Sequence, residues 1–218
     1  MPRSKTLYFI RHGESVSNAG GRTMVHKAIP LTERGHRQAK FIAEHLDVKP
    51  NLVLVSEHIR TQETAKPFCD RNRHDPVVVP KLNEFSALSH ELILGMNGKE
   101  RRPMANAYWN DADIHRRMGD FADTFTEFNL RVIEFKAIMD QLTDRTVIFG
   151  HGIWFGLLVW QLLGFEVFDS LSMKAFRRFQ TGLPLANGIV YRLTSKGSNN
   201  WRVQVDKKLL QAYLLSEE

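Results

Sequence analysis

Two segments of the sequence place a histidine directly after a short apolar run. Residues 6–10 lead into Arg11-His12-Gly13, and residues 146–149 lead into Gly150-His151-Gly152. We interpret both runs as buried strands, and α/β proteins bind ligands at the carboxyl ends of such strands. A neutral imidazole is a competent nucleophile toward phosphorus, and an arginine binds phosphate oxygens through two parallel hydrogen bonds. The two motifs therefore indicate phosphoryl chemistry at the strand ends.

Arg11 favours a neutral, nucleophilic His12, because a neighbouring positive charge disfavours a second one on the ring. Gly13 allows the backbone to turn and to approach a ligand closely. Taken alone, Arg11-His12-Gly13 is more typical of a strand that ends at the surface, and His151 of a core histidine near a turn. The chemical interpretation therefore depends on further residues.

Three further polar residues follow predicted strands or lie in a polar loop. A buried strand over residues 51–56 leads into a helix capped by Ser56, which puts Arg60 within about one turn of the start of that helix. Residues 76–80 predict a third strand, at a sheet edge because of its prolines, and Glu84 follows it. Asn18 lies in a glycine-containing loop whose amides could bind an anion. Each residue alone would be a surface residue, so only the whole set favours chemistry.

The remaining segments predict the elements that hold these side chains in place. Thr32 is the expected N-cap of a helix that runs to about residue 46, and residues 124–142 and 153–163 predict two more helices. Residues 188–193 and 201–205 alternate in polarity and predict a hairpin around residues 196–200. We expect one α/β domain over residues 1–218.

Residues 86–120 are irregular, with Met, Tyr, Trp and Arg scattered among polar residues. We interpret this segment as an inserted helical cap that could form the outer wall of a substrate pocket. Tyr108 and Trp109 fit a packing role and a ligand contact equally well.

Composition and charge exclude several other classes of protein. Hydrophobic residues at 43% and charged residues at 25% are ordinary for a soluble globular protein. The formal net charge of +6 suits an anionic substrate, but the basic runs are too short and too mixed to indicate nucleic-acid binding. Residues 146–165 are nearly apolar, yet His151, glycines and Gln161 interrupt them, which favours a buried strand and helix over a membrane span.

The cysteine content and the first residues bear on the compartment. Cys69 is the only cysteine, so no intrachain disulfide and no cysteine-based zinc cluster can form, and a reducing compartment is expected. The apolar run before Arg11 is too short for a signal peptide. We therefore expect a cytoplasmic location.

Taken together, these residues resemble the histidine phosphatase superfamily, the phosphoglycerate-mutase-like proteins. The resemblance covers most of the chain up to about residue 195. It implies a three-layer α/β/α sandwich with a mostly parallel central sheet, and no need for a metal or other cofactor. The motifs that carry it are residues 7–15 with Asn18 and Arg22, residues 30–35 with Gln38 and Ala39, residues 56–60 with Thr64 and Ala65, residues 82–84, and Gly150-His151-Gly152.

The resemblance also implies a role for each candidate residue. His12 would be the nucleophile that becomes phosphohistidine. Glu84 would donate a proton to the leaving oxygen and later act as the base for water. Glu84 must carry a proton to act as an acid, so we expect a mildly acidic optimum, and a rate that stays flat from about pH 5 to about pH 9 would count against this role. The residues implied to bind the substrate phosphate are Arg11, Asn18, Arg60 and His151.

Two departures from the family pattern guide the choice of activity. Val25 and Ala28 stand where relatives often carry Gly and Asp, and Val25 could narrow the pocket or alter a backbone contact. The residues after Glu84 lack the Arg-His-Tyr-Gly signature of the mutases. We therefore favour a phosphomonoesterase of the histidine acid phosphatase type.

Two alternatives remain open at this point. One is a phosphoglycerate mutase, and the other is a weakly catalytic module that binds a phosphorylated ligand. The full set of candidate residues argues against the module, because a binder would not require a positioned acid. The expected partner is a small-molecule phosphomonoester, with a phosphoprotein as a further option, and neither nucleic acid nor a membrane is expected. Neither the substrate nor the oligomeric state is predicted.

Overall fold

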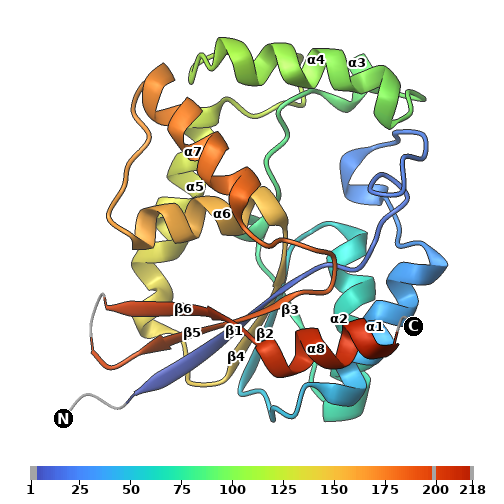
Figure 1. The fold of residues 1–218 in the computed structure, drawn as a ribbon, viewed down its shortest axis with the longest axis vertical. Coiled ribbons are helices and arrows are strands. Elements are labelled where there is room, and N and C mark those ends of the chain that lie inside the picture. The colour runs from blue at the N-terminus through green and yellow to red at the C-terminus, as the bar shows by residue number, and fades with distance from the viewer. Residues whose placement is uncertain (1–3, 198–199, 217–218) are drawn as a thin grey trace.

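One mixed sheet runs through the centre of the computed structural model, which describes residues 4–197 and 200–216. In that part of the chain the sheet has six strands in the order β3-β2-β4-β1-β5-β6 (Figure 1). β3, β2, β4 and β1 pair parallel with one another in that order, whereas β5 pairs antiparallel with β1 and with β6. The predicted, mostly parallel sheet is therefore confirmed. The strands are β1 (Lys5–Arg11), β2 (Leu52–Val55), β3 (Val77–Val78), β4 (Thr146–Gly150), β5 (Val190–Ser195) and β6 (Trp201–Val205).

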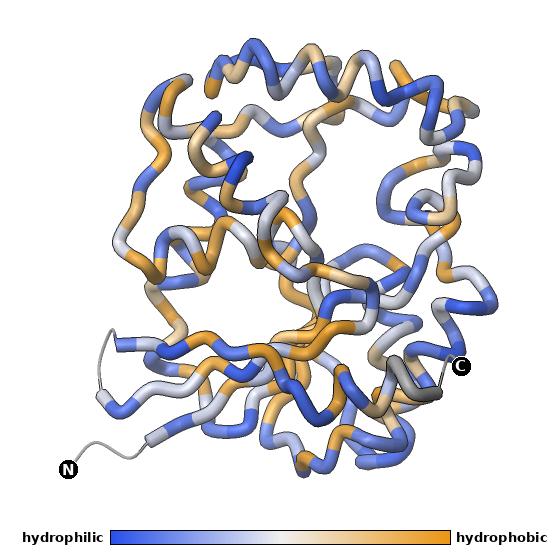
Figure 2. Tube along the Cα trace, viewed as in Figure 1, coloured by the Kyte–Doolittle hydropathy of each residue, from blue (hydrophilic) through white to orange (hydrophobic). Residues whose placement is uncertain are grey.

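The two faces of the sheet pack against separate helical layers. Val147 and Phe149 of β4 share a core with α1, α2 and α8, while Ile148 faces the opposite side with α5 and α6. This division follows from the alternation of side chains along a strand. Figure 2 shows the hydrophobic central strands between these layers. The expected three-layer sandwich is confirmed, and its helices are α1 (Glu33–His45), α2 (Ile59–Asn72), α5 (Phe125–Ile138), α6 (Gly152–Leu162) and α8 (Lys207–Ser216).

Local capping signals located some helices well and others poorly. Thr32 caps α1 as predicted, because its side-chain oxygen accepts the Gly35 N–H at 3.1 Å. The predicted cap at Ser56 is wrong: α2 begins at Ile59, with His58 at its N-cap. The Ser56 hydroxyl instead lies 2.8 Å from Nε2 of His151.

Other element predictions needed smaller corrections. The helix expected over residues 124–142 ends at Ile138 and continues as a 3-10 helix, Met139–Gln141. The hairpin of β5 and β6 is confirmed, although residues 198–199 of its expected turn lie outside the described residues. The sequence did not predict α7 (Ser170–Gly182) or α8.

Residues 86–120 form a helical layer above the carboxyl ends of the parallel strands (Figure 1). It contains α3 (His90–Ile93) and α4 (Gly98–Asp111). Arg101 of α4 donates to the backbone oxygen of Ser17 at 2.8 Å and to its hydroxyl at 2.9 Å. These contacts of Arg101 fix residues 86–120 to the loop that follows β1.

Tyr108 is fully buried in the core, so its role is packing.

The apolar stretch of residues 146–165 forms β4, a turn and α6, as the sequence predicted. Among residues 4–197 and 200–216, no helix combines the length and apolar character needed to cross a membrane.

Candidate active site

His12 lies at the end of β1, where two hydrogen bonds fix its ring. Nδ1 lies 2.7 Å from the backbone oxygen of Gly13, so this nitrogen carries the proton. Nε2 then accepts a hydrogen bond from Nε of Arg60 at 3.2 Å. Burial lowers the pKa of His12 well below 6.5, and the charges of Arg60 and Arg11 lower it further. The ring is therefore neutral at pH 7, with the lone pair of Nε2 on the Arg60 side.

Two arginines supply positive charge around His12. Arg60 stands in the first turn of α2, is only 8% exposed, and donates from Nη1 to the backbone oxygen of His26 at 2.9 Å. Arg11 donates to the backbone oxygen of Leu185, and its buried Nε has no hydrogen-bond partner among the described residues. Burial lowers the pKa of Arg60 to about 10 and also lowers that of Arg11. Both guanidinium groups stay charged at neutral pH.

His151 lies beside His12, with 5.2 Å between the two ring centroids. It is the N-cap residue of α6 and is fully buried. The hydroxyl of Ser56 bonds Nε2, while Nδ1 has no partner among the described residues. Burial, followed by the charge of Arg60, lowers the pKa of His151 well below 6.5. His151 thus presents a second neutral imidazole next to the first.

Glu84 is fixed to the amino end of α6. Its Oε2 accepts the Ile153 N–H at 3.0 Å, and its Oε1 accepts the N–H groups of Trp154 at 2.9 Å and Phe85 at 3.0 Å. The first N–H groups of a helix lack partners within the helix, and His151 makes no side-chain cap bond there. Glu84 therefore caps α6 from a distant part of the chain, which fixes the carboxylate in the site.

Asn18 lies on the exposed loop after β1, at the rim of the site. Its Oδ1 accepts from the hydroxyl of Ser15 at 3.0 Å and from Nδ2 of Asn187 at 3.1 Å. Asn187 Nδ2 also lies 3.0 Å from the backbone oxygen of His12. The sequence did not single out Asn187, because it is one polar residue in a turn before a strand.

These side chains surround a cavity of about 300 Å³. His151 contacts the ring of His12 but does not line this cavity. Two further wall residues, His26 and His58, were not recognised from the sequence. Burial and the charge of Arg60 lower their pKa values to about 4 and about 3. A single histidine in a loop carries no sequence signal, so only the fold could bring these rings to the site. The predicted residues on the cavity wall are Arg11, His12, Asn18, Arg60 and Glu84.

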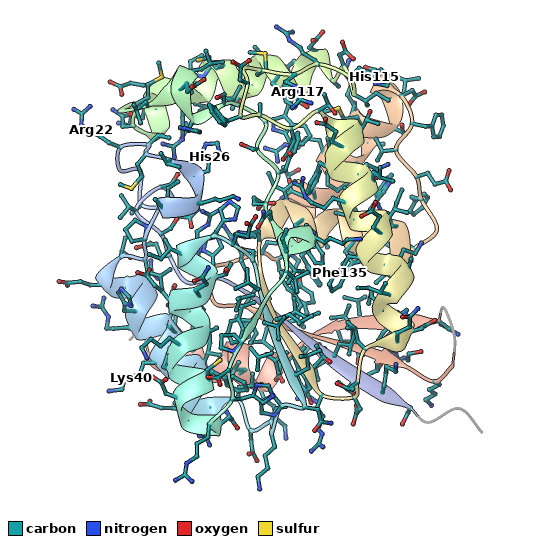
Figure 3. The ribbon with its side chains drawn as sticks, turned by 180° about the vertical axis from the view of Figure 1, so that it is seen from behind. Arg22, His26, Lys40, His115, Arg117 and Phe135 are labelled. Atoms are coloured by element: carbon teal, nitrogen blue, oxygen red, sulfur yellow. The ribbon has the colours of Figure 1, made fainter. Side chains whose placement is uncertain are left out.

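His26 belongs to a 3-10 helix, His26–Ala28, which Figure 3 shows beside the amino end of α2. The neighbouring Val25 does not line this cavity; it lines an adjacent one. Within the described ranges no group of three or more His, Cys, Asp or Glu side chains could hold a metal ion. The positive charge of the site comes from Arg11 and Arg60.

One known family matches almost the whole chain. The sequence pattern of the histidine phosphatase superfamily (branch 1) matches residues 7–202. The chain belongs to this superfamily. The resemblance noted for the motifs around His12, Arg60, Glu84 and His151 is therefore confirmed at the level of the family. The histidine phosphatase superfamily and the similar proteins indicate a phosphatase or mutase enzyme.

Some of the similar proteins are named as mutases and others as phosphatases. A protein of Enterobacter sp. (strain 638) named "Probable phosphoglycerate mutase GpmB" is 28% identical over 176 residues, which cover 77% of this chain and 79% of that protein. The alpha-ribazole phosphatase from Shigella flexneri has a TM-score of 0.72 at 25% identity, with 92% of this chain and 95% of that chain covered. The mycobacterial glucosyl-3-phosphoglycerate phosphatase has a TM-score of 0.67 at 21% identity, with 94% and 98% covered. These structural likenesses support the fold.

Proposed function

We propose that this protein is a phosphatase that hydrolyses phosphomonoesters through a phosphohistidine at His12. The observation that carries the proposal is the state of the His12 ring: a bonded Nδ1 proton, a neutral imidazole and an Nε2 lone pair that faces Arg60. An imidazole in this state is ready to attack an electrophilic phosphorus.

In the first step, Nε2 of His12 attacks phosphorus and the bond from phosphorus to the leaving oxygen breaks. Glu84 gives its proton to that oxygen, so an alcohol leaves and a phosphohistidine stays. In the second step, water attacks the phosphohistidine while Glu84 takes the proton from it. Inorganic phosphate leaves, and His12 and Glu84 return to their starting states.

The charges that stabilise the transferring phosphoryl group come from side chains that already face the site. A bound phosphate would take over the Nε–H of Arg60 that now bonds His12. Arg11 offers a further contact from the cavity wall, with Asn18 at the rim. We also assign to the phosphate group the unpartnered Nδ1 of His151, a residue that lies beside His12 and does not line the cavity. Such fixed donors can stabilise the developing charge as a bound cation would.

The proposal extends to the rest of the chain. We assign residues 1–218 to a single domain in which residues 86–120 act as the cap of the substrate pocket. A cytoplasmic enzyme fits the single cysteine, Cys69, which is buried and whose pKa burial raises to about 11. The substrate in this proposal is a small-molecule phosphomonoester.

A phosphoglycerate mutase is the second candidate, because relatives carry that name. A mutase would move phosphate between two positions of a glycerate and release little of it to water. A weakly catalytic module that binds phosphorylated ligands is the third, and the carboxylate of Glu84 at the cavity argues against it.

The test is phosphate release from a panel of phosphomonoesters that includes 3-phosphoglycerate, with wild type and His12→Ala side by side. We expect release that disappears in His12→Ala, together with an acid-labile, base-stable phosphoenzyme in the wild type only. Interconversion of 2- and 3-phosphoglycerate without release would favour the mutase. If neither phosphate release nor interconversion is observed, the binding module is favoured.

A further inference from the structure

A second cavity, of about 440 Å³, opens from the catalytic one on the side of the general acid. The two cavities share His26, His58, Glu84 and Ser86 as wall residues. In the proposed reaction Glu84 protonates the leaving oxygen, so the group attached to that oxygen extends past Glu84. The second cavity is therefore the candidate space for the leaving group.

Three rings and an exposed aliphatic side chain form much of this cavity. His26 and His90 meet edge to face at 5.8 Å between ring centroids, and His90 meets Phe121 at 4.9 Å. Phe121 is 59% exposed and Val25 is 47% exposed, although both are apolar. Rings of this kind bind flat aromatic groups by offset or edge-to-face contact.

The charged residues at this cavity already hold partners. Arg131 donates to Asp123 from both terminal nitrogens, at 3.1 and 3.0 Å, and Lys27 pairs with Glu57 at 2.8 Å. A carboxylate on the leaving group would also face the carboxylate of Asp123, which opposes it. The wall thus disfavours an anionic leaving group such as a glycerate.

We propose that the cavity walled by His90, Phe121 and Val25 is the leaving-group subsite, and that it selects phosphomonoesters whose leaving group carries an uncharged aromatic ring. This inference rests on the proposed phosphatase function. It assigns two residues to substrate selection: His90 of the cap segment, and Phe121, which directly follows that segment.

The test compares 2-phenylethyl phosphate with ethyl phosphate, since both release a primary alcohol and differ mainly in the ring. We expect kcat/KM to be about tenfold or more higher for 2-phenylethyl phosphate. Phe121→Ala is expected to remove most of that preference, so that the ratio of kcat/KM for 2-phenylethyl phosphate to that for ethyl phosphate falls toward one. Phe168→Ala is the matched control, because Phe168 is 71% exposed and lines neither cavity.

The outcomes separate this inference from the proposed function. Equal kcat/KM for both esters, with no effect of Phe121→Ala, would overturn the subsite and leave the phosphatase standing. A preference for 3-phosphoglycerate over both esters would overturn the subsite as well. Absence of His12-dependent release would overturn the phosphatase. In that case, equilibrium binding still tests the subsite. The affinities of wild type and Phe121→Ala for 2-phenylethylphosphonate and for ethylphosphonate show whether the cavity prefers the aromatic ring.

Discussion

Replacement of Glu84 by glutamine tests the link between the fold and the proton transfer most directly. The carboxylate accepts three backbone N–H bonds, two of them from the first turn of α6. Glutamine keeps one acceptor oxygen but turns an NH₂ group toward an N–H donor. The variant Glu84→Gln therefore keeps the shape of the site, removes the transferable proton and leaves at least one N–H of the helix start without a partner.

Two magnitudes follow from this geometry. An unsatisfied buried donor costs about 1–3 kcal/mol of folding stability, so the variant stays folded with a lower melting temperature. Loss of general acid catalysis lowers the rate by about 10²- to 10⁴-fold, which is about 3–5 kcal/mol of transition-state stabilisation. This loss applies in full only to a leaving group that needs the proton.

The assay exploits that difference between leaving groups. For an alkyl ester such as 2-phenylethyl phosphate, we expect kcat/KM of Glu84→Gln to fall by about 10²-fold or more. For p-nitrophenyl phosphate, whose phenolate leaves without protonation, we expect a loss within about tenfold. The control is Glu134→Gln. It removes a carboxylate of α5 that pairs with Lys81, and it is expected to change kcat/KM for neither ester.

An equal loss on both esters would refute the assignment of Glu84 as the general acid, because a distorted site would affect both reactions alike. A loss below about tenfold on the alkyl ester would refute it too. Thermal unfolding of both variants shows whether the fold has changed.

Three further predictions follow from the site. Ser56→Ala leaves Nε2 of His151 without its hydroxyl partner. We therefore expect thermal unfolding to show a loss of about 1–3 kcal/mol of folding stability, together with a lower kcat/KM for p-nitrophenyl phosphate. Wild-type values for both quantities would contradict the role of Ser56. The pKa values of His26 and His58 are lowered to about 4 and about 3 in the folded protein. Between those values and about 6.5 the unfolded chain therefore binds protons that the folded chain does not. Calorimetry should show the free energy of unfolding falling as the pH drops from about 6.5 toward about 4. A stability that is constant across that window would be inconsistent with neutral, buried rings. Incubation with EDTA is expected to leave phosphate release unchanged, because Arg11 and Arg60 supply the positive charge; a loss restored by added Mg²⁺ or Zn²⁺ would contradict this.

The sequence by itself determined the two strand ends and their chemistry. Apolar runs that stop at Arg11-His12-Gly13 and Gly150-His151-Gly152 are local patterns, and burial of such runs produces β1 and β4. The two strands are adjacent and parallel in the sheet, so their ends meet and the rings of His12 and His151 lie 5.2 Å apart. The order of the motifs along the chain was also sufficient to identify the family.

The tertiary structure alone decided what surrounds those rings. Ser56 bonds His151 instead of capping α2, because the hydroxyl meets a histidine 95 residues later in the chain. Glu84 caps a helix that begins 68 residues after it, and Asn187 supports the backbone of His12 from 175 residues away. Contacts at such separations have no periodicity or local signature. They depend on how the sheet and its helices pack, which also places His26, His90 and Phe121 on the wall of one cavity with Glu84, the proposed general acid, and so sets the proposed choice of leaving group.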